Sequence, residues 1–175
     1  MSSWFVFFVQ TGKERVICNY LNEMIGDEET VAFIPLIELI YKNSRQVRKE
    51  LKPMFPGYIL AESVIDERKF VSKVSQITRR TAHFINLLGK ENPDCMALHD
   101  NEKELLGFCD DKHIVQESIG FIEGDKVTVT SGPLRGRESI INRLDRHRRR
   151  AEVELEFMGD VRRISVSLEV VEKIK

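Results

Sequence analysis

The stretch that decides the fold is GDKVTVTSGPLRGRESII, residues 124–141. Val127 and Val129 alternate with polar residues, and a second β-branched pair follows at Ile140 and Ile141. Between the two pairs lie a Ser-Gly-Pro turn at 131–133 and a further glycine, which permit backbone geometry that other residues resist. The stretch therefore predicts two short strands joined by a tight loop.

The residues that follow continue the β pattern. Val153, Leu155 and Phe157 alternate with glutamates, and a period of two is typical of a half-buried strand. Strands are predicted over 126–130, 137–145, 151–157, 161–167 and 169–174. Because closure removes exposed sheet edges, residues 121–175 are predicted to form a small all-β barrel.

The first 110 residues predict a different architecture, in which helices alternate with strands. Strands are predicted over 4–9, 30–41 with an interruption at Pro35, 54–62 and 82–87. Helices are predicted over 12–26, over 67–76 with Asp66 as N-cap, and around Leu105, Leu106 and Phe108 with Asp94 or Asp100 as cap. This order favours an α+β domain over 1–110, an antiparallel sheet with packed helices, followed by a polar linker over 111–120.

Two strings carry a family resemblance. Residues 124–141 resemble the KOW motif, found in small SH3-like barrels, and MFPGYIL at 54–60 stands upstream of it. Together with the apolar strand from Trp4 and the closing segment from Phe157, they resemble the NusG family of transcription elongation factors. The resemblance implies a NusG-type N-terminal domain, a linker and a C-terminal KOW domain.

The resemblance implies an apolar site for the clamp coiled coil of RNA polymerase. The matching positions are Phe55, Tyr58, Leu60 and Phe84. A turn containing Pro and Gly tends to present side chains at an edge, so contact is favoured for Phe55 and Tyr58. Trp4 and Phe8 fit a core position as well as a contact.

A second candidate site is the arginine-rich turn RHRRR at 146–150. Guanidinium groups so close together repel one another, and they suit phosphates and the edges or faces of bases. The candidate RNA-binding residues are Lys126, Arg135, Arg137, Arg143, Arg146, His147, Arg148, Arg149, Arg150, Arg162 and Arg163. The opposing interpretation is that Glu152, Glu154 and Glu156 neutralise some of these charges across strands.

This turn resembles LoaP, a specialised antiterminator branch whose KOW domain binds an RNA hairpin. Met158 stands where the housekeeping branch has an exposed aromatic residue, which argues against contacts to termination factor Rho or a ribosomal protein. Weaker candidates for contact with non-template DNA are Thr78, Arg79 and Arg80, of which Thr78 and Arg79 match a position in specialised paralogues. The basic side chains within 42–52 (Lys42, Arg45, Arg48, Lys49 and Lys52) fit either DNA contact or a solubilising loop.

The net charge of −1 conceals an uneven distribution. Residues 90–118 are acidic, whereas residues 1–89 and 119–175 are mildly basic. The pattern is expected of two nucleic-acid-facing modules joined by a solvated connector.

No apolar run approaches the ~20 residues that span a bilayer, and the chain is expected to be a cytoplasmic monomer.

The sequence offers no catalytic motif, and no enzyme activity or cofactor is expected. Cys95, His99, Cys109 and His113 are ligand types that zinc accepts, but their spacing is atypical and no metal site is predicted. The expected function is transcription antitermination, in which the N-terminal domain binds RNA polymerase and the KOW domain binds an RNA hairpin of the leader transcript. The rivals are a general elongation factor that couples polymerase to Rho or the ribosome, and a ribosome-associated RNA-binding protein.

Overall fold

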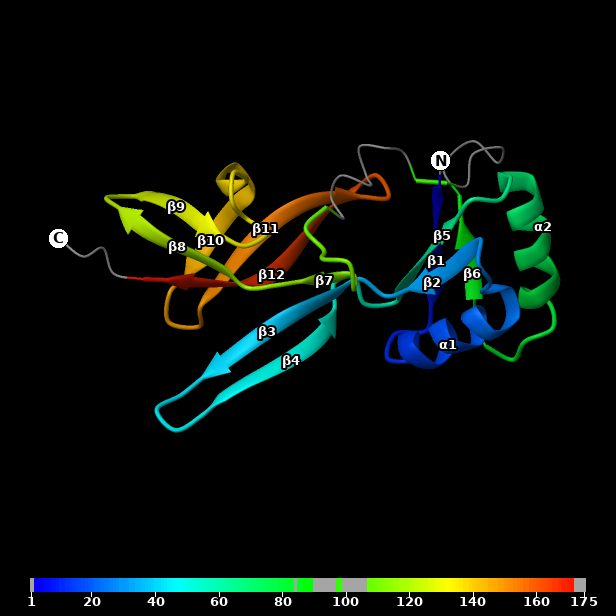
Figure 1. Ribbon diagram of the computed structural model, residues 1–175, viewed down its shortest axis with the longest axis horizontal. Coiled ribbons are helices and arrows are strands. Elements are labelled where there is room, and N and C mark those ends of the chain that lie inside the picture. Colours follow the sequence, from blue (N-terminus) through cyan, green and yellow to red (C-terminus); the bar gives the residue numbers. More distant parts are fainter. Residues whose placement is uncertain (1, 84, 90–96, 99–106, 172–175) are drawn as a thin grey trace. The chain divides into compact units, whose positions relative to one another are not determined.

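The computed structural model describes residues 2–83, 85–89, 97–98 and 107–171. The chain divides into two compact units (Figure 1). Unit 1 combines Met1–Pro35 with Phe55–Lys103, and unit 2 combines Leu36–Met54 with Glu104–Lys175. Each unit is therefore built from two separate segments of the sequence.

Unit 1 is a four-stranded sheet with two helices. Its strand order is β2-β5-β1-β6, and neighbouring strands are antiparallel. The strands are β1 (Ser3–Val9), β2 (Thr30–Phe33), β5 (Tyr58–Ser63) and β6 (Ile85–Leu88), and the helices are α1 (Glu14–Ile25) and α2 (Glu67–Thr78). Both helices pack on the same face of the sheet, as Figure 1 shows, and close a core with it. The predicted α+β architecture is confirmed for this unit.

The helices form where their apolar spacing and caps predict them. In α1, Ile17, Leu21 and Ile25 recur at intervals of four and are buried. The N-cap of α2 is Asp66, whose carboxylate accepts hydrogen bonds from the backbone N–H groups of the second and third helical residues. Phe70 of α2 stacks on a phenylalanine of the central strand with ring centroids 3.8 Å apart, which fixes this helix on the sheet.

Unit 2 contains two sheets. The first has strand order β4-β3-β7, in which β3 (Leu36–Lys42) and β4 (Val47–Pro53) form a hairpin and β7 (Ile114–Val115) is short. The second has order β10-β11-β12-β8-β9, from β8 (Ser118–Glu123), β9 (Lys126–Ser131), β10 (Ile141–Asp145), β11 (Arg150–Phe157) and β12 (Asp160–Val170). Its only parallel pair among the described strands is β12 with β8.

A short 3-10 helix, η1 (Glu138–Ile140), links the two outer strands of the five-stranded sheet. It leads directly into β10, and the Glu138 carboxylate accepts a hydrogen bond of 3.0 Å from the backbone N–H of Val129 on β9. The backbone N–H of Glu138 itself, followed by that of Val129, lowers the pKa of the Glu138 carboxyl. Leu134, in the loop between β9 and η1, is fully buried and anchors the loop that the opening sequence motif predicts.

Two stretches differ from the sequence-based expectation. Residues 111–120 were expected to be irregular, yet β7 and the start of β8 lie there, because the buried Ser118 pairs with β12. The two strands predicted over 161–167 and 169–174 are largely one continuous strand, β12. The predicted third helix falls mostly outside the described residues.

The β3–β4 hairpin belongs to unit 2, whereas the expected boundary at residue 110 assigned it to the first domain. That boundary remains a prediction. Within the described parts of the chain, no helix has the length and apolar character needed to span a bilayer.

Candidate nucleic-acid interface

The arginine-rich stretch forms the turn between β10 and β11. Asp145, the last residue of β10, accepts a hydrogen bond of 2.9 Å from the backbone N–H of Arg148. This bond, aided by the neighbouring positive charges, lowers the pKa of the Asp145 carboxyl and keeps it ionised. Arg149 has a φ of 54°, in the left-handed region that non-glycine residues rarely occupy. The chain thus folds back tightly at this point.

The guanidinium groups of the turn differ in how firmly they are held. The Arg148 side chain is 81% exposed and lies 3.8 Å from the Asp145 carboxylate. Arg149 lies 3.7 Å from Glu169, a contact at the long end of the ion-pair range. Arg150 donates to the Ser167 hydroxyl and to the backbone carbonyl of its neighbour, each at 3.1 Å. The turn therefore has one fixed cation, Arg150, and one largely solvated cation, Arg148.

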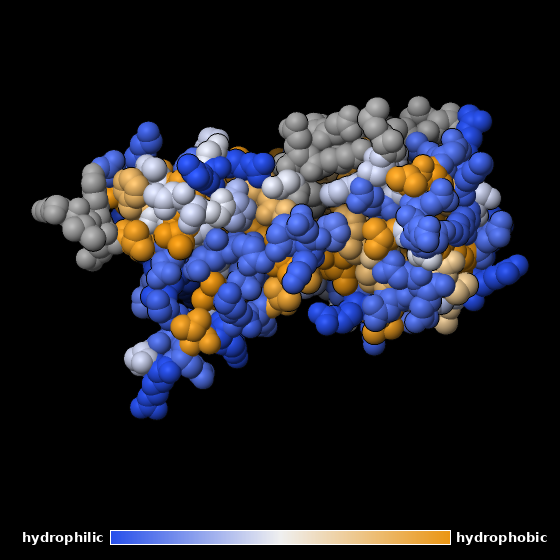
Figure 2. Space-filling model, in the orientation of Figure 1, coloured by the Kyte–Doolittle hydropathy of each residue, from blue (hydrophilic) through white to orange (hydrophobic). Residues whose placement is uncertain are grey.

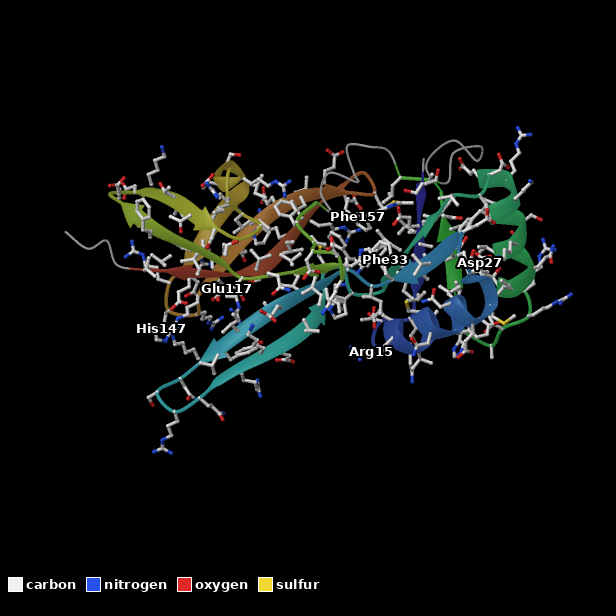
Figure 3. All side chains as sticks on the ribbon, viewed as in Figure 1. Arg15, Asp27, Phe33, Glu117, His147 and Phe157 are labelled. Atoms are coloured by element: carbon white, nitrogen blue, oxygen red, sulfur yellow. The ribbon has the colours of Figure 1, made fainter. Side chains whose placement is uncertain are left out.

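The turn and the β3–β4 hairpin enclose an open hollow of about 1130 Å³. His147, labelled in Figure 3, lies in the turn on the side of the hairpin. The hollow is lined by six cationic side chains, His147 and two carboxylates; the cations are Lys42, Arg48, Arg143, Arg148, Arg149 and Arg150, and the carboxylates are Asp145 and Glu152. Figure 2 shows that hydrophilic residues cover most of the hairpin. The excess of cations over carboxylates gives the hollow a positive potential suited to phosphates.

The expected RNA-binding set does not gather in one place. Arg143, His147, Arg148, Arg149 and Arg150 line the hollow, whereas the others do not.

Several of those outside the hollow have partners of their own. The Arg163 guanidinium lies 2.7 Å from Glu154 on the paired strand, so this pair fits the cross-strand neutralisation considered above. Arg162 lies 3.3 Å from Asp160. Arg137 lies over the Phe108 ring at 4.3 Å. Lys126, Arg135 and Arg146 are exposed elsewhere on unit 2.

The basic residues of the hairpin also separate into two groups. Lys42 and Arg48 line the hollow. Lys49 pairs with Glu38 at 3.0 Å, and Lys52 lies 3.7 Å from Glu50. Only part of the hairpin's charge therefore faces the candidate site.

The Ser167 hydroxyl group connects the hairpin to the five-stranded sheet through the backbone of β3. The Ser167 hydroxyl donates to the Glu38 carbonyl at 2.9 Å and accepts from the Ile40 N–H at 3.2 Å, both on the outer edge of β3. It also accepts the bond from Arg150. One donor and two acceptor positions are the full capacity of a hydroxyl group. Sequence analysis missed Ser167, because nothing in the β12 pattern separates it from an ordinary polar residue.

Tyr41 is the second residue that sequence analysis missed. Its ring lies 5.0 Å from the Arg48 guanidinium carbon, across the hairpin, and 5.1 Å from that of Arg150. Both distances are within the ~6 Å range of cation–π attraction. A tyrosine placed directly before the basic stretch that begins at Lys42 was a signal that the sequence did offer.

The expected polymerase-binding residues of unit 1 are mostly buried. Phe55 is 4% exposed and Leu60 is fully buried, whereas Tyr58 is half-buried. Phe84 lies outside the described residues. The expectation that the turn presents Phe55 at an edge is not met: the turn closes through a bond from the Tyr58 N–H to the Phe55 carbonyl, and the Phe55 side chain is buried.

The accessible aromatic pair in this region is Phe8 with Tyr58. Phe8 is 37% exposed, and its ring centroid lies 5.4 Å from that of Tyr58, which is its register partner on β5. Because side chains alternate along a strand, both point away from the face that α1 and α2 cover. Because its side chain is far more accessible, Phe8 is a better contact candidate than Phe55.

The candidates for DNA contact lie at the end of α2. Thr78 is the last residue of this helix, and Arg79 and Arg80 follow it as exposed side chains. No group of side chains able to hold a metal ion occurs among the described residues; Cys95 and His99 lie outside them. Burial, followed by the charge of Asp110, raises the pKa of Cys109 to about 12, which makes its thiol a poor ligand and nucleophile.

Comparisons with known proteins place the chain in a family. The family profile described as "NusG: Transcription termination factor nusG" matches residues 2–106. The chain is 21% identical to the transcription termination/antitermination protein NusG of Pseudomonas aeruginosa, over 98% of both chains. It is 23% identical to the protein of the same name in Borreliella burgdorferi, again over 98% of both chains. For the Vibrio cholerae protein the identity is 21%, over 98% of this chain and 95% of the relative. The family profile covers more than half of the sequence and the three relatives align over nearly all of it, so the chain belongs to the NusG family of transcription termination/antitermination factors.

Proposed function

We propose that this protein is an antitermination factor that binds RNA polymerase through unit 1 and a structured RNA through the hollow in unit 2. The observation that carries the RNA part is the excess of cations around the hollow, six against two carboxylates. Family membership supplies the context of transcription, in which a nascent transcript is present. The C-terminal strands act in this proposal as a KOW domain.

The ion pairs within the hollow are weak enough to be exchanged for phosphates. The exposed Arg148 guanidinium meets its carboxylate at 3.8 Å, and an exposed pair of this kind contributes only about 0–1 kcal/mol. The half-buried Arg149 pair is also long, at 3.7 Å. Guanidinium groups bind phosphate through two parallel hydrogen bonds, and each such bound phosphate releases a condensed counterion from the RNA. Binding RNA is therefore favoured over the internal pairs.

The proposed polymerase contact uses the exposed part of unit 1 around Phe8 and Tyr58. Aromatic side chains lose little conformational entropy on binding and suit a groove that receives a helix, as in a coiled coil. Each of the two interactions can be weak, because binding of one unit raises the local concentration of the other.

One observation weighs against the rival in which the C-terminal strands contact Rho or a ribosomal protein. The loop after β11 buries Phe157 at 1% exposure and turns through Met158, which has a φ of 54°. The loop therefore presents no aromatic side chain to a protein partner. Co-purification with ribosomal subunits and not with polymerase would instead select the ribosome-associated function.

The test is a salt titration of RNA binding by the full chain and by the variant Arg148→Ala/Arg149→Ala. A fluorescent stem–loop RNA transcribed from a leader region is the probe, and anisotropy is the readout. The log–log salt slope should fall by roughly 0.7–0.9 for each phosphate that the variant no longer binds.

The matched control is Arg15→Ala/Arg68→Ala, which removes the same charge from exposed positions of unit 1. It should leave the slope unchanged. If the two double variants bind alike, non-specific attraction explains the binding and the hollow is not the RNA site.

A further inference from the structure

The hairpin side of the hollow contains an aromatic ring that phosphate binding alone does not use. Tyr41 is 38% exposed and lines the hollow, with the guanidinium carbons of Arg48 and Arg150 at 5.0 and 5.1 Å from its ring centre. Bases that leave a helix stack on aromatic rings and on guanidinium planes. The same three side chains thus offer both kinds of surface that an unpaired base uses.

We propose that Tyr41, Arg48 and Arg150 hold one unpaired base of the bound RNA, so that the protein recognises a loop or bulge and not a plain duplex. This inference rests on the proposed RNA-binding function and adds the class of RNA that the hollow selects. It also makes the β3–β4 hairpin part of the RNA site.

The two arginines have different freedom, which allows a base to enter. Arg150 is fixed by its bonds to Ser167 and to the carbonyl of Arg149. The Arg48 side chain is 66% exposed and its carboxylate partner, Glu50, lies 3.7 Å away. Arg48 can therefore swing aside or close over a base that stacks on the Tyr41 ring, while Arg150 stays in place.

The surroundings of Tyr41 fit the rest of the nucleotide. The hollow, at about 1130 Å³, is large enough for a whole nucleotide, because pockets for small ligands measure ~300–1,000 Å³. Lys42 and Arg148 lie on its lining where they can meet the flanking phosphates. Gln46 and Ser165 also line it, and their polar groups can bond to a ribose 2′-hydroxyl, which only RNA carries.

A duplex does not use this arrangement. The major groove of A-form RNA is too narrow for side chains to reach the bases, and a paired base has no free face for a ring. Duplex RNA should therefore bind through the cations alone, with no contribution from Tyr41.

The hairpin is held where the proposal requires it. Besides the Ser167 bonds to β3, the Lys42 ammonium lies 3.4 Å from Glu169 of β12. Tyr41 lies between Ile40 and Lys42, the β3 residues at which these two contacts are made. Its position relative to the arginine-rich turn is thus set before RNA binds, which limits the entropy lost on binding.

The experiment compares Tyr41→Leu with Tyr41→Phe in the full chain. Leucine keeps an apolar side chain but removes the ring, and phenylalanine keeps the ring. The probes are a stem–loop RNA with 2-aminopurine in its loop, the same stem as a blunt duplex, and the stem–loop as DNA. Circular dichroism checks that the variants are folded.

We expect Tyr41→Leu to weaken stem–loop binding by roughly 5- to 150-fold, the range measured for one stacked base. Its blunt-duplex affinity and its salt slope should match the wild type, because the substitution leaves the charge unchanged. Tyr41→Phe should bind all probes as the wild type does, and 2-aminopurine fluorescence should change on binding to both ring-bearing proteins.

Any one of four results would overturn the inference. If Tyr41→Leu binds the stem–loop as tightly as the wild type, RNA binding stands and the base site does not. If the wild type binds no RNA even at low salt, the proposed function fails as well. If stem–loop DNA binds equally, the hollow accepts single strands in general. Should Tyr41→Leu not fold, a wild-type complex with unchanged 2-aminopurine fluorescence would overturn the inference by itself.

Discussion

Replacing Ser167 with alanine should detach the β3–β4 hairpin from the five-stranded sheet. Ser167 is 1% exposed, and its hydroxyl bonds to the Glu38 carbonyl, the Ile40 N–H and the Arg150 guanidinium. Alanine removes the oxygen while keeping the backbone and most of the volume. The two backbone groups of β3 then lose their partner on the edge that faces away from β4.

The expected cost follows from these two backbone groups. A buried donor or acceptor left without a partner costs about 1–3 kcal/mol. Arg150 keeps its bond to the carbonyl of Arg149, so the cost at this side chain is smaller. Allowing for partial access of water to the edge, the variant should lose about 2–4 kcal/mol of hairpin attachment.

Hydrogen exchange at the Ile40 amide, which donates to the Ser167 hydroxyl, reports the loss of this contact. A loss of ~2–4 kcal/mol corresponds to exchange faster by roughly 30-fold or more. Trp4 is in unit 1 and the chain has one tryptophan, so its fluorescence should show unit 1 unfolding as in the wild type.

The control is Ser165→Ala, an exposed serine two residues earlier on the same strand, which should change stability by no more than about 0.5 kcal/mol. The reasoning is refuted if Ser167→Ala folds and its Ile40 amide exchanges at the wild-type rate. In that case, other contacts hold the hairpin in place.

Two further predictions concern buried and half-buried carboxyl groups. Glu14 is 5% exposed and accepts from the backbone N–H groups of Gly12 and Gly57, each at 2.8 Å, so Glu14→Ala should destabilise unit 1 by about 2–4 kcal/mol. Urea unfolding followed by Trp4 fluorescence measures this, and an unchanged midpoint would contradict it. Burial, followed by the negative charge of Glu169, raises the pKa of Glu117, so its contribution to unit 2 stability is full below its unfolded pKa and is lost as the pH rises through the folded one. Glu117→Gln should therefore gain stability relative to the wild type as the pH rises from about 4 to 7, measured by thermal unfolding; a constant difference would contradict it.

Local patterns in the sequence were sufficient for much of the secondary structure. The spacing of Ile17, Leu21 and Ile25 predicts α1, and Asp66 predicts the start of α2, because both signals act within one or two helical turns. The alternation from Val153 to Phe157 likewise predicts β11 and its buried face. The order of these elements, with the two family motifs, was enough to identify the family.

The composition of the candidate site depends on contacts between residues far apart in the chain. Glu38 and Ser167 are 129 residues apart in the sequence. No local pattern predicts that the hydroxyl group of a residue on one strand will form a hydrogen bond with the backbone of a strand so distant in the sequence. For the same reason, the sequence indicated that the 146–150 turn was basic but did not reveal that Tyr41 lies within reach of it. It also placed Phe55 at an exposed edge, whereas the closed turn buries that side chain.

The sequence by itself determined both described helices, most of the strands, the family and the charge of the turn, because periodicity, capping and composition are properties of neighbouring residues. Only the tertiary structure decided which charges share a hollow and which are neutralised by a partner, as Arg163 is by Glu154. The physical reason is that electrostatic and stacking interactions depend on distances of a few ångströms between side chains, and these distances are fixed by strand pairing and packing across the whole unit.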